Sequence, residues 1–375
     1  MVKGKTPPSS IPSKDSGRES RRNPINSTPD SPLSTHGKQM TPDPLTRIVK
    51  MGRKVDPIIF ETLAQASSSK FQSPVNYHFR TGGKRMRATL VLLACAACGG
   101  SIEDGMNPAA LVEMIHNYSL VMDDLIDRGV VRRGKSTVRV QFGDSIALLV
   151  AMLYREALDN LIEKCISPNK IRRIAVQSMK DIIEGERLDL LLEQAGRQDP
   201  YLKSQHILTP SFSLYVEMIG KKTSALFKAA SEIGAYSARA KPGIVKSLGE
   251  FGWKAGLAFQ IMDDVLDICG QETGKQIGKD IIEHKLGNAA ILTALRYLPR
   301  NKKSEILTTL RSEKVSQSMM MRARQLVMET PAERDCREIA EKYLNEAKTH
   351  LSVLRRSVYR DGLATLSDAI VSRTF

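Results

Sequence analysis

The chain has 375 residues, of which 41% are hydrophobic, 26% charged and 5% aromatic. This hydrophobic fraction is enough for a sizeable core and indicates a globular protein rather than a disordered one. The longest apolar runs, residues 88–98 and 146–154, are shorter than the roughly 20 residues that cross a bilayer, so we expect no transmembrane segment.

The formal net charge is +15, which a nucleic-acid partner, polyphosphate substrates or a solvated basic surface would each explain. The basic residues are spread along the chain without an aromatic-interleaved cluster. We therefore expect no nucleic-acid partner, for which steeply salt-dependent affinity would be the sign. Five cysteines at scattered spacings predict no disulfide framework and a reducing, cytoplasmic compartment.

In chain order, residues 1–45 come first and are rich in Ser, Pro, Thr, Lys and Arg, which predicts a disordered tail. Transit peptides share the Ser and Arg bias, so organelle import stays open, although Asp15 and Glu19 fit it poorly. Over residues 46–375, apolar residues recur at three- and four-residue spacing between Gly- and Pro-containing turn signals. No useful strand pattern appears, so we predict one all-α domain over 46–375.

The strongest signal is an acidic motif, D-D-x-x-D, that ends two apolar segments. Its aspartates are Asp123, Asp124 and Asp127 in the first copy and Asp263, Asp264 and Asp267 in the second. The outer two of each copy are four residues apart and share a helix face. Like charges in apolar surroundings are costly unless a cation joins them, and Mg²⁺ prefers such oxygen ligands together with substrate phosphates. The pattern predicts a shared magnesium site; two solvated acidic helix ends are the simpler alternative.

Basic residues accompany both acidic motifs. They are Lys84, Arg85 and Arg87 at a glycine turn, Arg132, Arg133 and Lys135 after the first motif, Lys221 and Lys222 in a later helix, and Lys275, Lys279 and Lys285 after the second motif. Each group alone is a weak signal, because such groups are usually solvated. Their position beside the aspartates favours a site for a phosphorylated substrate.

These motifs, in this order, resemble those of the trans-prenyltransferase family, the short-chain isoprenyl diphosphate synthases. The resemblance covers residues 50–350 and includes G-G-K-R at 82–85, E-x-x-H-x-x-S-L at 113–120 and F-Q-x-x-D-D-x-x-D at 259–267. It implies an isoprenoid-synthase-type helical bundle around a central cavity, in a homodimer. It also implies an enzyme that ionises an allylic diphosphate, adds isopentenyl diphosphate to the cation and then loses a proton.

The resemblance also assigns residues to substrates. All six motif aspartates would be catalytic, and about three Mg²⁺ ions would be held by Asp123, Asp127, Asp263 and Asp267. Isopentenyl diphosphate would bind Lys84, Arg87, His116 and Arg133. The allylic diphosphate would bind Arg132, Lys222, Thr223, Gln260, Lys275 and Lys285. For His116, a buried core histidine is the alternative.

Product length is expected to depend on Tyr118 and Ser119, the fifth and fourth residues before Asp123. Tyr118 lies about 7.5 Å from Asp123 along a helix axis. A bulky ring with a small neighbour resembles archaeal-type geranylgeranyl diphosphate synthases and favours a C20 product, with C15 next. Ordinary core packing of Tyr118 is the alternative.

Several positions depart from the family pattern: Met122, Arg139, Ala151, Met152, Glu186, Gly287 and Asn288. None removes a metal ligand, but together they leave room for a regulatory subunit with little turnover. Such partners often lack an aspartate motif, whereas both are complete here. A longer-chain polyprenyl synthase is a further alternative, against which Tyr118 argues. A terpene cyclase would need no G-G-K-R segment.

Overall fold

The computed structural model describes residues 44–195, 197–270 and 277–372. Residues 1–43 of the predicted tail lie outside the described residues, as does Lys275. The boundary expected after residue 45 falls inside the first helix, α1, which begins at Pro44. A proline is well tolerated in the first turn of a helix, because that turn needs no N–H donor.

The all-α prediction is confirmed. The first half of the described chain contains α1 (Pro44–Gly52), η1 (Arg53–Val55), α2 (Asp56–Ala66), α3 (Gln72–Arg80), α4 (Met86–Ala97), α5 (Ile102–Ile126), α6 (Val138–Phe142), α7 (Asp144–Glu156), α8 (Leu158–Ile162) and α9 (Pro168–Leu192). Helix α5 begins with a capping box, in which Ser101 Oγ accepts from the Asp104 backbone N–H at 3.1 Å and Asp104 accepts from the Ser101 N–H at 3.0 Å. This helix ends within the first acidic motif, as predicted.

The second half continues with α10 (Pro200–Gln205), α11 (Phe212–Ile219), η2 (Gly220–Ser224), α12 (Ala225–Ser237), α13 (Pro242–Cys269), α14 (Lys279–Ile282), α15 (Ala289–Tyr297), α16 (Arg300–Arg311), α17 (Gln317–Met328), α18 (Ala332–Thr349), η3 (His350–Val353) and α19 (Val358–Ser372). Element η2 is a π-helical turn between α11 and α12. Such turns are rare and occur often at functional sites. Helix α13 carries the second acidic motif at its C-terminal end.

A two-stranded ribbon departs from the purely helical expectation. Strands β1 (Val131–Arg132) and β2 (Lys135–Ser136) pair antiparallel, and Arg132 lies opposite Lys135. The two residues between them, Arg133 and Gly134, have φ values of +55° and +72°. Two consecutive positive φ values are the mark of a tight hairpin turn, and strands this short leave no alternating sequence pattern to detect.

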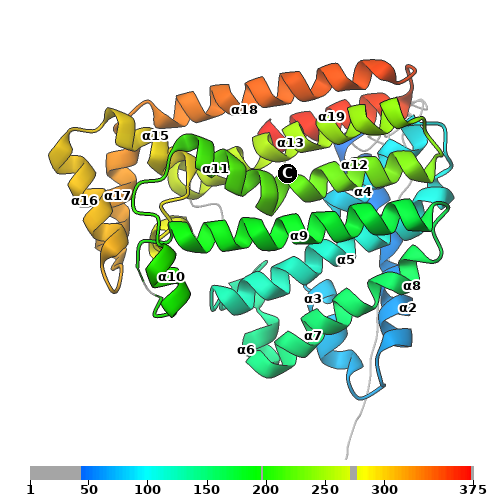
Figure 1. The fold of residues 1–375 in the computed structure, drawn as a ribbon, viewed down its shortest axis with the longest axis horizontal. Coiled ribbons are helices and arrows are strands. Elements are labelled where there is room, and N and C mark those ends of the chain that lie inside the picture. Colours follow the sequence, from blue (N-terminus) through cyan, green and yellow to red (C-terminus); the bar gives the residue numbers. More distant parts are fainter. Residues whose placement is uncertain (1–43, 196, 271–276, 373–375) are drawn as a thin grey trace, which may run out of the picture. The chain divides into compact units, whose positions relative to one another are not determined.

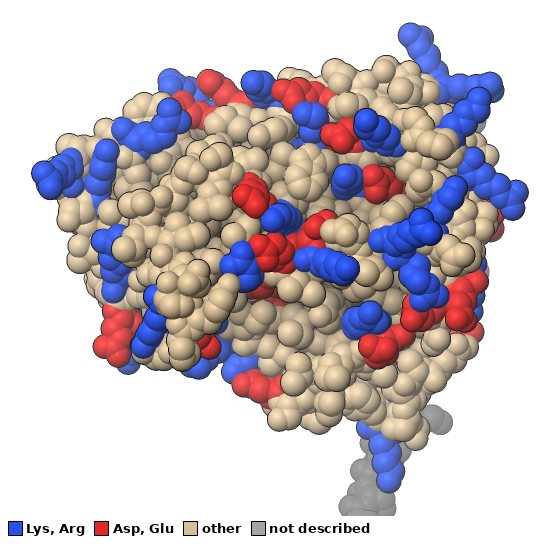
Figure 2. Space-filling view, in the orientation of Figure 1, with Lys and Arg blue, Asp and Glu red and all other residues tan. Residues whose placement is uncertain are grey.

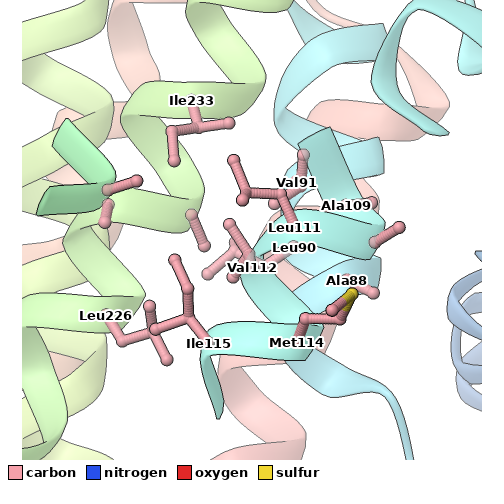
Figure 3. Close-up of a cluster of buried hydrophobic side chains, with 14 of the residues drawn as sticks. Ala88, Leu90, Val91, Ala109, Leu111, Val112, Met114, Ile115, Leu226 and Ile233 are labelled. Atoms are coloured by element: carbon pink, nitrogen blue, oxygen red, sulfur yellow. The ribbon is translucent and has the colours of Figure 1, made fainter. Parts of the chain in front are cut away.

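The helices pack in two hydrophobic clusters. In the first, α4, α5 and α12 meet through side chains such as Val91, Leu111, Ile115 and Ile233, all buried (Figure 3). The second contains the C-terminal half of α13 together with α11, α15, α17 and α18. Helices α9, α12, α13 and α18 run side by side, with α16 and α17 at one end (Figure 1). The apolar lengths of α5 and α13 are thereby buried, and their aspartates are left between the two clusters.

The surface and composition predictions can also be compared with the structure. On the face drawn in Figure 2, acidic and basic side chains are interspersed. Among the described helices, none is long and apolar enough for a membrane span. All five cysteines have unpaired thiols, which agrees with the expectation that no disulfide framework is present.

Candidate active site

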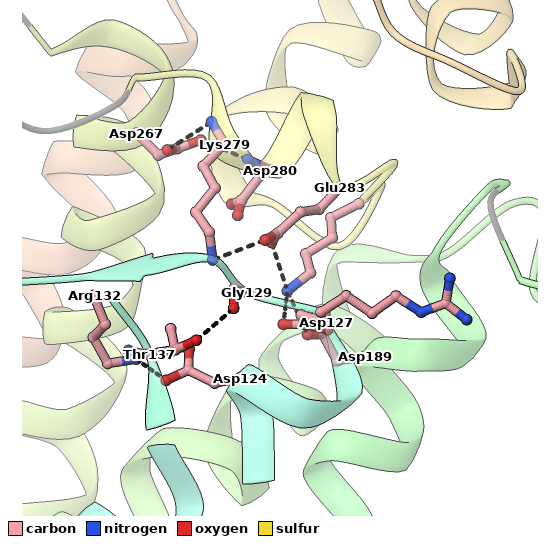
Figure 4. Close-up of polar contacts among 12 residues, drawn as sticks. Asp124, Asp127, Gly129, Arg132, Thr137, Asp189, Asp267, Lys279, Asp280 and Glu283 are labelled. Carbon is pink, nitrogen blue, oxygen red and sulfur yellow. Dashed lines mark hydrogen bonds and ion pairs between the residues drawn. The ribbon is translucent and has the colours of Figure 1, made fainter. Parts of the chain in front are cut away.

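The first acidic motif separates into an anchoring aspartate and two outer ones. Asp124, the middle residue, is buried and accepts from Arg132 Nε at 2.9 Å to each of its oxygens (Figure 4). This pair ties the end of α5 to strand β1. The structure thus places Arg132 beside the motif, but on a carboxylate. Its role toward an allylic diphosphate stays a prediction.

Asp127, at the C-terminal end of α5, lies between two cations. Its carboxylate accepts from Arg197 Nη2 at 3.0 Å and from Lys285 Nζ at 3.3 Å. Burial opposes ionisation of Asp127, but Lys285 and Lys222 outweigh it and lower its pKa. Asp123, one turn earlier, has its pKa raised, chiefly by burial. Lys222 and Lys285 thus act on both outer aspartates of this motif, but only at Asp127 do they outweigh burial.

The second acidic motif is divided in the same way. Its middle residue, Asp264, is buried and accepts from Tyr215 Oη at 2.7 Å, from the Ala289 N–H at 2.9 Å and from Gln260 Nε2 at 2.9 Å. Burial raises the pKa of Asp264 well above its usual range. We read Asp264, like Asp124, as an anchor, here for α11 and α15.

Asp267 lies one turn further along α13. Each of its oxygens accepts one backbone N–H, from Lys279 and from Asp280, both at 3.0 Å. Burial and then the charge of Asp280 raise the pKa of Asp267 to about 7. One lone pair on each oxygen is left for another partner.

A chain of charged side chains connects the two motifs. Lys279 pairs with Glu283 at 2.8 Å, Glu283 with Lys285 at 3.3 Å, and Lys285 with Asp127 (Figure 4). Because the backbone of Lys279 also bonds Asp267, α5 and α13 direct their aspartates toward one region. In the described residues no group of three or more carboxylate, thiol or imidazole side chains is arranged so that it could hold a metal ion by itself. Open pairs of aspartates still fit Mg²⁺, which commonly binds one or two carboxylates plus water and phosphate oxygens.

The cations predicted for isopentenyl diphosphate gather around the turn between α3 and α4. In this turn Gly82 and Gly83 have φ values of +99° and +131°. Arg133 donates to the Gly82 carbonyl, and Arg87 Nη1 lies 3.2 Å from His116 Nε2. Lys84 is exposed on the same turn. Residues from three separate segments of the sequence are thus brought close to this turn.

Arg85 belongs to the same turn but points into the protein. It is 3% exposed, with φ +52°. Its guanidinium donates to Asp56 at 2.7 Å and to the carbonyls of Phe79 and Gly82 at 3.2 Å, and it lies 3.6 Å from the buried Glu113. Arg85 therefore holds the turn from the inside, a role that sequence reasoning did not assign.

Two histidines of this region should make stability depend on pH. Burial, followed by nearby arginines, lowers the pKa of His78 to about 3 and that of His116 well below its usual value. Both stay neutral in the folded protein, while the unfolded chain takes up protons below about pH 6.5. The histidine contribution to the free energy of unfolding should therefore fall as the pH falls from 6.5 to 5, by about 1.4 kcal/mol per pH unit and histidine, whereas Asp267 and Glu186, with pKa values raised to about 7, contribute in the opposite sense.

Urea denaturation at several pH values measures this dependence. Relative to the wild type, a His78→Gln variant should gain stability as the pH falls over the same interval, because one of the two proton uptakes by unfolded histidines is removed. Equal slopes of the unfolding free energy against pH in the two proteins would contradict the expectation.

Three of the residues predicted for the allylic diphosphate lie on η2 and α13, namely Lys222, Thr223 and Gln260. Lys222 Nζ is 2.5 Å from Glu186 and 2.6 Å from Asp189, both on α9. Thr223 Oγ1 donates to Gln260 Oε1 at 2.8 Å, and Gln260 continues to Asp264. Lys285 also reaches Asp189, at 3.4 Å. These residues adjoin the first acidic motif, since Lys222 acts on the pKa of both Asp123 and Asp127.

Sequence reasoning missed several members of the site. They are Asp56, Asp189, Glu193, Arg197, Tyr215, Asp280 and Glu283, while Glu186 was noticed only as a departure. One signal was available: Glu186 and Asp189 form an acidic pair three residues apart on one helix face, just before an apolar run, as the outer motif aspartates do at four residues. The others lie in segments of ordinary composition.

The residues predicted to set product length lie on the helix that leads to the first motif. Tyr118 is partly buried against the first hydrophobic cluster, and Met122 packs there as well, one turn further on. Ser119 Oγ donates to the His116 carbonyl at 2.9 Å. Nothing in these contacts separates a tunnel-lining role of Tyr118 from core packing, so its effect on chain length stays a prediction.

Comparison with known proteins identifies the family of this chain. The polyprenyl synthetase family matches residues 68–327. A short chain isoprenyl diphosphate synthase of Methanothermobacter thermautotrophicus is 30% identical over 329 residues, 86% of this chain and 97% of the relative. A geranylgeranyl diphosphate synthase of Methanosarcina mazei is 29% identical, over 86% and 95%. The crystal structure of geranylgeranyl pyrophosphate synthetase from Pyrococcus horikoshii superposes with a TM-score of 0.78 at 29% identity, covering 88% of this chain and 98% of that one.

The fold and the paired aspartate motifs are those of a prenyltransferase. The chain belongs to the polyprenyl synthetase family, since that family covers well over half of its length. The predicted family and enzyme class are thereby confirmed.

Proposed function

We propose that this protein condenses isopentenyl diphosphate with an allylic diphosphate to give a short-chain trans-prenyl diphosphate, with C20 geranylgeranyl diphosphate as the main product. The observation that carries the proposal is the meeting of two D-D-x-x-D motifs on α5 and α13, joined by Lys285 and bordered by two separate groups of cations. Two groups of cations suit two diphosphate substrates. The names of the relatives support the C20 product.

Magnesium is part of the proposal. Asp123, Asp127, Asp263 and Asp267 would hold the ions, which supply positive charge to the departing diphosphate. The chain's own contribution is to orient that diphosphate with Lys222 and Lys285, whose buried ammonium groups keep raised pKa values and stay charged. Preorganised cations of this kind favour ionisation of the allylic C–O bond. Arg87, Arg133, His116 and Lys84 would hold isopentenyl diphosphate so that its double bond attacks the allylic carbocation.

The decisive experiment is a product assay. The purified chain, with Mg²⁺, isopentenyl diphosphate and each allylic primer in turn, should yield a C20 product. Products beyond C25 would favour a longer-chain synthase, and absence of turnover with every primer would favour a regulatory subunit. Prenyl transfer without formation of cyclic hydrocarbons separates the proposal from a terpene cyclase.

Tyr118 offers a test of the C20 assignment. A Tyr118→Ala variant should lengthen the main product by at least one isoprene unit, because removal of the ring leaves space beside the growing chain. Chromatography of the products measures the change, and Tyr118→Phe serves as a control that keeps the ring in place. An unchanged product would mean that Tyr118 is ordinary core packing.

A homodimer in the cytoplasm completes the proposal. Val140 on α6 and Leu148, Leu149 and Met152 on α7 are 45–55% exposed, an apolar group that a second copy would cover. Sedimentation velocity of the whole chain tests this, and a monomer at micromolar concentration would contradict it. The unpaired thiols support a reducing compartment, which microscopy of the tagged full-length chain would test.

A further inference from the structure

Glu186 lies at the closest approach of two helical elements. It follows Gly185 on α9, where a Cβ atom would come within 2.2 Å of the Lys222 backbone nitrogen. Only glycine therefore lets α9 pack directly against the π-helical turn η2 that carries Lys222. This contact brings the Glu186 side chain, 8% exposed, to the Lys222 ammonium.

Lys222 is held by two carboxylates at once. Its Nζ lies 2.5 Å from Glu186 Oε2 and 2.6 Å from Asp189 Oδ2. Of its three N–H donors, one makes a hydrogen bond to Asp189, whereas the contact with Glu186 is an ion pair. The positive charge of Lys222 also opposes the burial-driven rise in the pKa of Asp123, which indicates that Lys222 lies close to the first acidic motif.

One carboxylate would balance the positive charge of Lys222, and Glu186 supplies a second one beside Asp189. Asp189 is shared between Lys222 and Lys285, at 2.6 and 3.4 Å, and is already well compensated. Glu186 has Lys222 as its ion-pair partner, and among the described residues neither of its buried carboxylate oxygens has a hydrogen-bond donor. Burial, opposed by Lys222, raises the pKa of Glu186 to about 7. A buried charge that is only partly compensated lowers the stability of the fold. The presence of Glu186 therefore points to a role other than stabilisation.

We propose that Glu186 is a positioning residue which, with Asp189, holds the Lys222 ammonium in place for the allylic diphosphate, and whose negative charge weakens the binding of that diphosphate. The inference rests on the proposed function, since it takes Lys222 as part of the allylic site. Glu186 therefore has two effects: it orients Lys222 toward the diphosphate, and its negative charge favours release of that diphosphate.

Binding of inorganic diphosphate tests the charge effect. Isothermal titration in EDTA at pH 8.5, above the pKa of Glu186, should show that Glu186→Gln binds inorganic diphosphate about tenfold more tightly than the wild type, because one nearby negative charge is removed. Glu184→Gln is the matched control. Glu184 lies two residues earlier on the same helix, is about 39% exposed and pairs with Arg187, so its removal should change the affinity less than twofold.

Kinetics test the positioning effect. Glu186→Gln should lower the KM of the allylic substrate several-fold and leave that of isopentenyl diphosphate unchanged. Glu186→Asp keeps the charge but is one methylene shorter; it should raise the allylic KM at least threefold without tighter diphosphate binding. This second variant keeps the test valid if Glu186→Gln does not fold.

The outcomes separate the inference from the proposed function. Diphosphate affinity of Glu186→Gln equal to that of Glu184→Gln, or an allylic KM unchanged in Glu186→Asp, overturns the inference while prenyl transfer by the wild type upholds the function. Absence of prenyl transfer by the wild type overturns the function itself.

Discussion

The kcat of an Asp123→Ala variant should be about a thousandfold lower than that of the wild type, while the fold is kept. Arg132 binds the middle aspartate, Asp124, whereas Asp123 is an outer aspartate of the motif. Burial raises the pKa of Asp123, and a bound cation would offset the cost of burying its negative charge. Loss of one group that stabilises developing charge typically costs a factor of about 10²–10³ in kcat. Steady-state kinetics with a Mg²⁺ titration measures the loss, and thermal stabilisation by Mg²⁺ should weaken in parallel.

Asp181→Ala is a suitable control for this experiment. Asp181 is an acidic residue on α9 that accepts only a surface hydrogen bond from Gln177. It should retain the wild-type kcat and the wild-type response to Mg²⁺. Near-normal turnover of Asp123→Ala, with circular dichroism like that of the wild type, would rule out the metal assignment.

An Arg85→Met variant should be destabilised by about 3 kcal/mol and should bind isopentenyl diphosphate poorly. The substitution leaves Glu113, 2% exposed, without its arginine, and removal of one partner of a buried pair typically costs about 3–5 kcal/mol. It also releases the carbonyls of Phe79 and Gly82, so the glycine turn loses its inner support. Urea denaturation measures the first effect. The KM of isopentenyl diphosphate, compared with that of the allylic substrate, measures the second.

Two further variants define the cause. Arg322→Met removes an arginine that pairs with Glu305 on the surface, and should change the unfolding free energy by less than about 1 kcal/mol. In the double variant Arg85→Met/Glu113→Gln, part of the lost stability should return, because no buried charge is left uncompensated. An Arg85→Met protein as stable as Arg322→Met would show that the buried contacts contribute little.

Much of the architecture could be predicted because its signals are local. Apolar residues at three- and four-residue spacing identify α5 and α13, and the repeated D-D-x-x-D identifies their ends. The glycines at 82 and 83 identify the turn before α4, since positive φ values favour glycine. Each signal depends on residues within a few positions of one another, so it can be read before any packing is known.

Tertiary structure decided which of these residues work together. Lys285 and Asp127 are 158 positions apart, and Lys222 and Asp189 are 33 apart, yet each pair meets in the fold. It also divided each acidic motif into one buried anchor and two outer carboxylates, which identical residue types could not reveal. The physical reason is that the pKa and the contacts of a charged side chain depend on burial and on neighbouring charges. Both are set by the helices packed around the side chain more than by the residues next to it in the sequence. The sequence by itself thus determined the helices, the family and the kinds of groups in the site, whereas the packing of α5, α9 and α13 determined the role of each group.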